Sequence, residues 1–240
     1  MLTADFDRVG IAVGDLVADL GCGGGRHTFE LLARGAHTLS VDINDGVLKD
    51  VSGMVAAMRA DNQITDTTLH ASVNGSALAL PFQSGSLNGL IASEVLEHIP
   101  NDEDAMSEIA RVVRPGGWVV ATVPRAWPEK ICWALSSDYH SEAGGHVRIY
   151  RKRELIDRLG GAGLRLRSHH YAHALHSPLW WLKCAFGINN DAAKIPSLYH
   201  RFLVWDITRG SAWVRRVEGA LDPVMGKSLV VYAEKPSAQI

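Results

Sequence analysis

The stretch from Val17 to Arg26, VADLGCGGGR, decides the fold, because it joins an apolar run to a glycine-rich turn and then to a helical pattern. Glycine allows a backbone to turn tightly and to approach a ligand closely. In parallel sheets with helical crossovers, such a turn lies at the carboxyl edge of the sheet, where ligands bind. The stretch therefore predicts the end of a first strand, a ligand-binding turn and the start of a first helix.

Beyond this turn, short apolar runs alternate with helical patterns, which is typical of a parallel sheet with right-handed crossovers. The expected helices span 26–33, 47–59, 102–113 and 150–160. The expected strands are DLVADL (15–20), HTLSVD (37–42), TLHASV (68–73), LNGLIAS (87–93), GWVVATV (117–123), 164–170 and KSLVVYAEK (227–235). The order predicts an α/β, Rossmann-like fold with a seven-stranded, mostly parallel sheet and helices on both faces.

We expect residues 1–240 to form a single domain. Residues 1–125 are the expected cofactor-binding core, and 126–171 with 227–240 are expected to complete the sheet and the acceptor side. The segment 172–226 is too long for a structureless loop in a compact domain. It is therefore predicted to be a helical insertion, a lid over the ligand edge of the sheet.

Composition excludes several classes of partner. The chain has 24 Lys and Arg against 26 Asp and Glu, so it offers no basic stripe for the phosphate backbone of a nucleic acid. No apolar run reaches membrane-spanning length. Cys22, Cys132 and Cys184 are widely spaced, which favours a reducing compartment. We expect a cytoplasmic protein with a small-molecule or oligosaccharide partner, no membrane span and no nucleic acid; a homodimer through its aromatic residues is compatible with the sequence.

Two acids indicate which ligand the glycine turn receives. Asp19 lies two residues before Gly21, where a carboxylate can hold a cationic amino group but would repel a pyrophosphate at the same helix start. Asp42 closes the second strand, where it can accept hydrogen bonds from ribose hydroxyls. The pair favours an adenosine that carries an amino acid over a nicotinamide dinucleotide.

The ordered motifs VADLGCGGGRH, LSVDI, NGSALALPF, LNGLIASEVLEHIP and ARVVRPGG resemble those of class I S-adenosylmethionine-dependent methyltransferases of the type 11 kind, over residues 15–124. The resemblance implies S-adenosyl-L-methionine as the cofactor. Ser76 stands where that family usually has Asp, and Asn74 is an alternative partner for the adenine amino group. The predicted cofactor-binding residues are Asp19, Gly21, Cys22, Gly23, Arg26, Asp42, Ile43, Asn74, Gly75, Ser76, Ala77 and Ser93.

The stretch SEVLEHI (93–99) carries the candidate catalytic and metal-binding residues. If it is helical, Glu94, Glu97 and His98 share one face. It resembles that of metal-assisted O-methyltransferases, including those of ubiquinone biosynthesis and of small-RNA 3′ ends, where the matching residues bind Mg²⁺. His146, or else His140, is the expected additional ligand. In the metal-free alternative, Glu94 lies near the cofactor and His98 or His146 acts as the general base.

The stretch HHYAHALHSPLWWLKCAFG (169–187) concentrates histidine and tryptophan side chains, which suit the apolar faces of a sugar or a prenylated ring. Core packing or a subunit contact is the alternative for about half of such aromatics. We expect O-methylation, with carbohydrate favoured over a quinol or phenol because aromatic enrichment accompanies a near-neutral charge. A non-catalytic regulator that binds S-adenosylmethionine and a nicotinamide-dependent reductase are further alternatives. Arg148 and Tyr150 are expected to shape the acceptor pocket.

Overall fold

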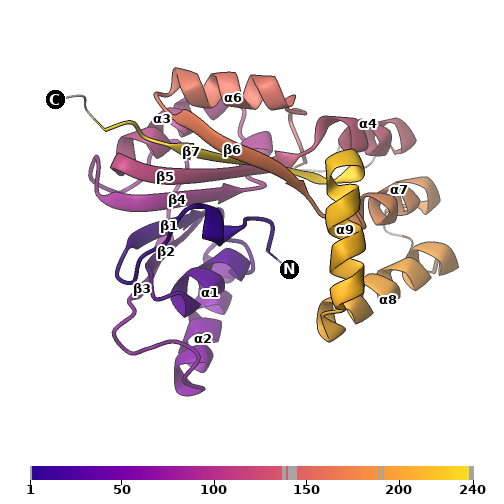
Figure 1. Ribbon diagram of the computed structural model, residues 1–240, viewed down its shortest axis with the longest axis horizontal. Coiled ribbons are helices and arrows are strands. Elements are labelled where there is room, and N and C mark those ends of the chain that lie inside the picture. The colour runs from indigo at the N-terminus through magenta and orange to yellow at the C-terminus, as the bar shows by residue number, and fades with distance from the viewer. Residues whose placement is uncertain (1, 137–138, 140–144, 189, 191, 238–240) are drawn as a thin grey trace.

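A seven-stranded sheet forms the centre of the protein, with strand order β3-β2-β1-β4-β5-β7-β6 (Figure 1). The computed structural model describes residues 2–136, 139, 145–188, 190 and 192–237. Strands β1 to β5 are parallel, and β7 runs antiparallel to both β5 and β6. This confirms the predicted fold class. The strands are β1 (Leu16–Leu20), β2 (His37–Asp42), β3 (His70–Asn74), β4 (Leu87–Ser93), β5 (Val113–Pro124), β6 (Arg165–Ala172) and β7 (Ser228–Glu234).

Helices cover both faces of this sheet (Figure 1). On one face, α3 (Asp102–Val112) and α6 (Lys152–Gly161) bury Ile109 and Leu155 against the sheet. On the other face lie η1 (Phe6–Arg8), α1 (Arg26–Ala33) and α2 (Asp45–Ala60), whose Phe6 and Leu31 pack against Ile91. β1 and β4 are neighbours in the sheet, but the chain continues from β1 to β2 on one side and from β4 to β5 on the other. The topological switch point therefore lies between β1 and β4, at the glycine turn.

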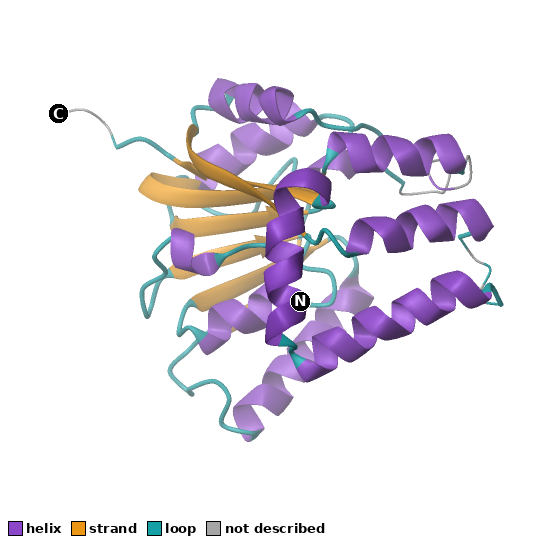
Figure 2. Ribbon diagram, turned by 45° about the vertical axis from the view of Figure 1, so that its right-hand side comes forward, coloured by secondary structure: helices purple, strands orange, loops and turns teal. Residues whose placement is uncertain are grey.

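Three helices fill the segment between β6 and β7: α7 (His176–Phe186), α8 (Lys194–Arg209) and α9 (Ala212–Met225). β6 and β7 are antiparallel neighbours with Ala172 opposite Ser228, so the helices replace the short loop of a hairpin. Helix α4 (Ala126–Leu135) follows β5 directly and packs against α7. Figure 2 shows α4, α7 and α8 grouped beyond one end of the strands. The α4 segment is a helix that the sequence pattern did not predict.

Among the described residues, none of the helices combines the length and the apolar character needed to cross a bilayer.

Candidate active site

The glycine turn between β1 and α1 is pinned to the neighbouring strand. The N–H groups of Gly21 and Cys22 both donate to the carbonyl oxygen of Val41 at the end of β2, at 2.7 and 3.1 Å. Gly21 has a φ of 64°, and a Cβ there would come within 2.4 Å of Val95 Cγ2. The turn therefore requires glycine at position 21, both for its left-handed backbone and for its close approach to the loop after β4.

The two acids that flank the turn hold its backbone. Asp19 is only 1% exposed, and its Oδ2 accepts from both the N–H and the hydroxyl of Thr28, which fixes the start of α1. Burial raises the pKa of Asp19 to about 6. Asp42 accepts from the N–H of Gly23 at 3.2 Å and from that of Asn44 at 2.9 Å. Both acids thus shape the turn, and their predicted contacts with a ligand stay predictions.

A pocket of about 430 Å³ opens at this switch point. Ile43, directly after β2, is 77% exposed at its edge, where an apolar side chain suits a flat ring. Six of the predicted cofactor-binding residues line the pocket, and the loop after β4 closes it from the other side through Val95, His98 and Ile99. These six are Gly21, Asp42, Ile43, Gly75, Ser76 and Ala77.

Other predicted cofactor residues lie outside the lining of this pocket. Cys22 is buried in the cluster formed by α1 and α2. Asn74 donates its amide to the carbonyl oxygen of Ile43 and to Asp45, so it braces the loop after β2 rather than facing the pocket. Arg26 donates to the Ser93 hydroxyl at 3.3 Å.

Glu94 does not lie on the helix that the spacing of its stretch predicts. The stretch 93–99 forms only a 3₁₀ turn, η2 (Leu96–His98), and Glu94 has a φ of 56°. The cause is pairing with β5, because the Glu94 N–H donates to the carbonyl oxygen of Thr122 and the Glu94 carboxylate accepts from the Thr122 hydroxyl. The expected helical face shared by Glu94, Glu97 and His98 is therefore not formed.

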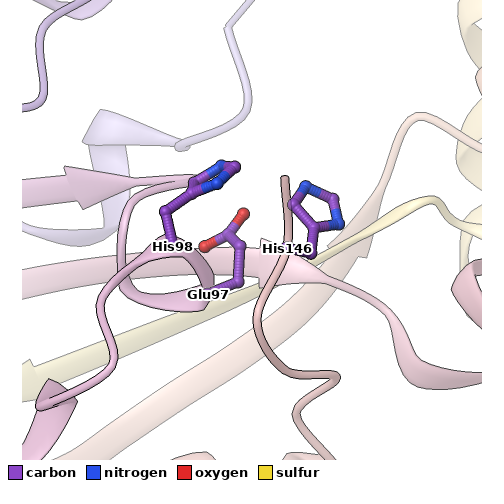
Figure 3. Close-up of side chains that lie close together, drawn as sticks. All are labelled: Glu97, His98 and His146. Atoms are coloured by element: carbon purple, nitrogen blue, oxygen red, sulfur yellow. The ribbon is translucent and has the colours of Figure 1, made fainter. Parts of the chain in front are cut away.

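Glu97, His98 and His146 nevertheless come together at the mouth of the pocket, with one ligand atom from each within 4.8 Å of the others (Figure 3). The Glu97 side chain is 0% exposed, and neither of its carboxylate oxygens has a hydrogen-bond partner among the described residues. Burial, together with the charge of Glu94, holds the pKa of Glu97 well above its usual value. Glu94 is not part of this group, and His140 lies outside the described residues.

A second carboxylate orients His146. Its Nδ1 lies 2.6 Å from Oε1 of the buried Glu129 on α4, which also accepts from Trp133 at 3.2 Å. An Nδ1 that donates to a carboxylate leaves Nε2 as an acceptor or metal ligand. Sequence reasoning missed Glu129. The available signal was an acid in the mostly apolar stretch AWPEKICWAL, which forms a helix directly after a strand.

Tyr150 and Arg148, which are predicted to shape the acceptor pocket, are not among the lining residues of the 430 Å³ pocket, and Arg148 lines a separate pocket of about 520 Å³ at the start of α3. Tyr150 is buried and donates its hydroxyl to Asp102, and Arg148 also donates to Asp102. They tie the segment before α6 to the start of α3, and Arg158 joins the same carboxylate at 2.7 Å. These residues therefore stabilise the fold beside the site.

A second pocket, of about 310 Å³, lies beside the first and receives part of the aromatic segment. Glu94 lines both pockets. The other residues that line the 310 Å³ pocket come from the N-terminus, from α1, and from the segment between β6 and β7 with its ends: Thr3, Arg26, His173, His176, Trp180, Ile207, Lys227 and Ser228. Of the other predicted aromatics, Trp181 donates its indole N–H to the carbonyl oxygen of Pro128 and packs against Trp127 on α4.

Known proteins resemble this chain in both sequence and fold. Residues 18–121 match the methyltransferase domain family. The ubiquinone biosynthesis O-methyltransferase of Leptothrix cholodnii is 28% identical over 190 residues, which cover 75% of this chain and 77% of that protein. The protein of the same name from Marinobacter nauticus is 26% identical and covers 67% and 68%.

Among solved structures, the geranyl diphosphate C-methyltransferase of Streptomyces coelicolor A3(2) is similar in fold, with a TM-score of 0.61 and 16% identity. The match covers 96% of this chain and 76% of that one, and that protein was solved with S-adenosyl-L-homocysteine. The family match begins in β1, includes the glycine turn and the pocket, and ends in β5. The chain is therefore a class I S-adenosylmethionine-dependent methyltransferase.

Proposed function

We propose that this enzyme transfers the sulfonium methyl group of S-adenosylmethionine to a hydroxyl oxygen of a small aromatic acceptor of the quinol or phenol class. The observation that carries the proposal is the group of Glu97, His98 and His146 at the mouth of the 430 Å³ pocket, which we call the cofactor pocket. The names of the relatives from Leptothrix cholodnii and Marinobacter nauticus support an oxygen acceptor of this class. They favour it over the carbohydrate that aromatic enrichment suggested.

The chemistry of such an acceptor suits these side chains. A phenolic hydroxyl has a pKa of about 10. This value is far closer to the pKa of an imidazole than the pKa of an aliphatic hydroxyl is. His98 lines the cofactor pocket, and its Nδ1 lies 3.3 Å from the carbonyl oxygen of Gly145, which leaves Nε2 to accept a proton. Methyl transfer itself is an in-line displacement, for which the protein supplies alignment and exclusion of water. His98 is therefore the proposed general base, and His146, held by Glu129, is its neighbour at a ring distance of 4.9 Å.

In an alternative arrangement, the same three residues hold a divalent cation, and His98 is then a ligand rather than the general base. A wholly buried carboxylate without a hydrogen-bond partner is costly unless an ion or a proton compensates its charge. A set of two imidazoles and one carboxylate suits Zn²⁺ or Mn²⁺ better than Mg²⁺, which prefers oxygen ligands. Glu94, the predicted additional oxygen ligand, is engaged with Thr122. A cation held by Glu97, His98 and His146 would polarise the acceptor hydroxyl and lower its pKa.

The test is transfer of labelled methyl groups to catechols, hydroquinones and saccharides, before and after EDTA and with Mg²⁺, Mn²⁺ or Zn²⁺ added back. We expect transfer to the phenolic acceptors, loss of that activity in Glu97→Gln, and full activity in the control Glu103→Gln, an exposed acid on α3. Activity insensitive to EDTA but lost in His98→Gln would leave His98 as the base without a cation. Transfer to saccharides alone would overturn the aromatic acceptor, and cofactor binding without any transfer would favour a regulator.

A further inference from the structure

A second group of metal-type ligands lies away from the pocket mouth, where the helices between β6 and β7 meet the sheet. It consists of His173 after β6, His176 at the first position of α7, and Glu218 on α9, with one ligand atom from each within 4.8 Å of the others. His173 and His176 are three residues apart, and their rings lie 5.4 Å apart. Elements distant in the sequence thus bring two imidazoles and a carboxylate to one point.

Two of these ligand atoms are buried without a partner. His176 Nδ1 and Glu218 Oε1 have no hydrogen bond among the described residues, and they lie 3.8 Å apart. That separation is too long for a hydrogen bond. It fits two ligands of one ion, because two atoms that each lie about 2 Å from a shared cation are about 3 to 4 Å apart. Buried orphaned atoms of this kind call for a missing water or ion.

The backbone around this group is held in place independently of any ion. The Ala174 N–H donates to Asp222 at 2.9 Å, and the Ser177 hydroxyl donates to the carbonyl oxygen of Met225 at 2.8 Å. The first bond joins the turn before α7 to α9, and the second joins the first turn of α7 to the end of α9, the helix that carries Glu218. Since the ligands are positioned by neighbouring contacts, little ordering entropy would oppose binding of a cation.

Side-chain contacts also orient the first histidine. His173 has a left-handed backbone, with a φ of 66°, which is uncommon for a residue other than glycine. Its Nε2 lies 3.1 Å from the Thr3 hydroxyl. Metal-binding histidines commonly use one ring nitrogen for such a bond while the other binds the metal. Two acids, Glu218 and the half-buried Asp222, supply negative charge at this point. They act against the positive charges of Arg26 and Lys227, which also act on His173.

We propose that His173, His176 and Glu218 form a second divalent cation site of the Zn²⁺ class. Two nitrogens and one carboxylate oxygen are ligands that Zn²⁺ accepts, with a fourth position left for water. His173 and His176 also line the 310 Å³ pocket, so the ion would tie α7 and α9 to the sheet and fix one wall of that pocket. The site does not rest on the proposed acceptor class, and its residues are separate from Glu97, His98 and His146.

The test is titration of the tag-free full-length chain with Co²⁺ as a spectroscopic probe, after removal of metal by a chelator. The double variant Glu97→Gln/His146→Gln serves as the background, so that the group at the pocket mouth does not contribute. We expect one Co²⁺ per chain with visible absorption. Adding His176→Gln or Glu218→Gln should weaken binding by at least about tenfold. The matched control is His200→Gln, an exposed histidine on α8.

Thermal unfolding supplies an independent readout. Zn²⁺ should raise the melting temperature of the background and of its His200→Gln form, but not of its His176→Gln form. Binding of S-adenosylhomocysteine by each variant checks that the fold is intact. Equal Co²⁺ affinity in the His176→Gln and His200→Gln forms would overturn the site, as would a background that binds no Co²⁺. Either result would identify the cluster as a histidine–glutamate contact without a metal.

Discussion

Gly21 illustrates how one residue constrains the cofactor site. With a φ of 64° and Val95 only 2.4 Å from where a Cβ would lie, Gly21→Ala forces the turn away from the loop after β4. We expect S-adenosylhomocysteine to bind at least about tenfold more weakly, which corresponds to 1.4 kcal/mol. Isothermal titration calorimetry measures this. Gly24→Ala is the control, because a Cβ there meets open space; equal losses in both variants would contradict the role given to Gly21.

Residues of the site differ in how far the sequence could reveal them. Gly21 and Asp42 were predictable because local motif spacing places them at the end of parallel strands, where neighbouring turns converge, whereas Ile43 was implied by the family resemblance. The helical face proposed for Glu94 does not form, because the i, i+3, i+4 spacing assumes a helix while pairing with Thr122 extends the strand contact by one residue; Glu94 lines the 430 Å³ pocket instead. Glu129 could not be found by spacing, since its partner His146 is seventeen residues away and meets it only through the tertiary fold.

At the scale of elements, Arg125 caps the C-terminus of α9. Its guanidinium donates to the carbonyl oxygens of Pro223 and Val224 in the last turn of α9, and to that of Asp222, which also accepts from the Gly226 N–H; it lies 3.7 Å over the Tyr171 ring. Arg125→Met should lower the free energy of unfolding by about 1 to 3 kcal/mol. Hydrogen exchange should rise first in the last turn of α9. Arg216→Met, at an exposed position of the same helix, should leave both unchanged; a similar rise in exchange there would contradict the capping role.

Asp102 ties α3 to α6 and makes this link sensitive to acid. Burial acts to raise its pKa, but the hydrogen bond from Tyr150 and the guanidiniums of Arg148 and Arg158 outweigh burial and hold the pKa below its ordinary value. A lowered pKa contributes stability that is present above the unfolded value of about 3.9 and is lost as the pH falls through the folded value. Asp102→Asn should therefore cost about 1.5 to 3 kcal/mol at neutral pH.

Urea unfolding from pH 7 down to pH 3 measures this difference. The gap between the wild type and Asp102→Asn should stay constant near neutrality and shrink only in the acidic range. Glu103→Gln, the neighbouring exposed acid, should follow the wild type at every pH. A gap that does not change with pH would show that geometry, rather than the charge of Asp102, stabilises the link.

The elements themselves were largely predictable. α1 and β2 were predicted with their observed bounds, because apolar periodicity and the glycine and asparagine residues that limit them are local features. α4 escaped prediction because its apolar residues do not form one clear stripe: it packs against α7 and presents Glu129 to His146. The pairing of β6 with β7 was not predicted, since three helices separate the two strands along the sequence.

At the scale of the whole molecule, the structure separates into a complete sheet and a set of helices inserted at its last hairpin. The 430 Å³ pocket is lined entirely by residues between Leu20 and Pro100, so none of it comes from the inserted helices. The 310 Å³ pocket takes His173, His176, Trp180, Ile207 and Lys227 from that region. We propose that the inserted helices act as a lid, which forms the acceptor side and leaves cofactor binding to the sheet.

Replacing residues 173–227 with an Asn-Gly turn tests this division, because Ala172 and Ser228 are already paired as hairpin neighbours. The shortened chain should fold and bind S-adenosylhomocysteine as the full chain does, since every lining residue of the 430 Å³ pocket is retained. Methyl transfer should fall by at least about a hundredfold, because acceptor and cofactor are no longer held in line. The exposed α4 face needs a control for aggregation, so light scattering accompanies calorimetry. If a monodisperse, folded chain no longer binds the cofactor, the inserted helices support the cofactor pocket. If methyl transfer continues at full rate, the inserted helices do not form the acceptor side of the enzyme.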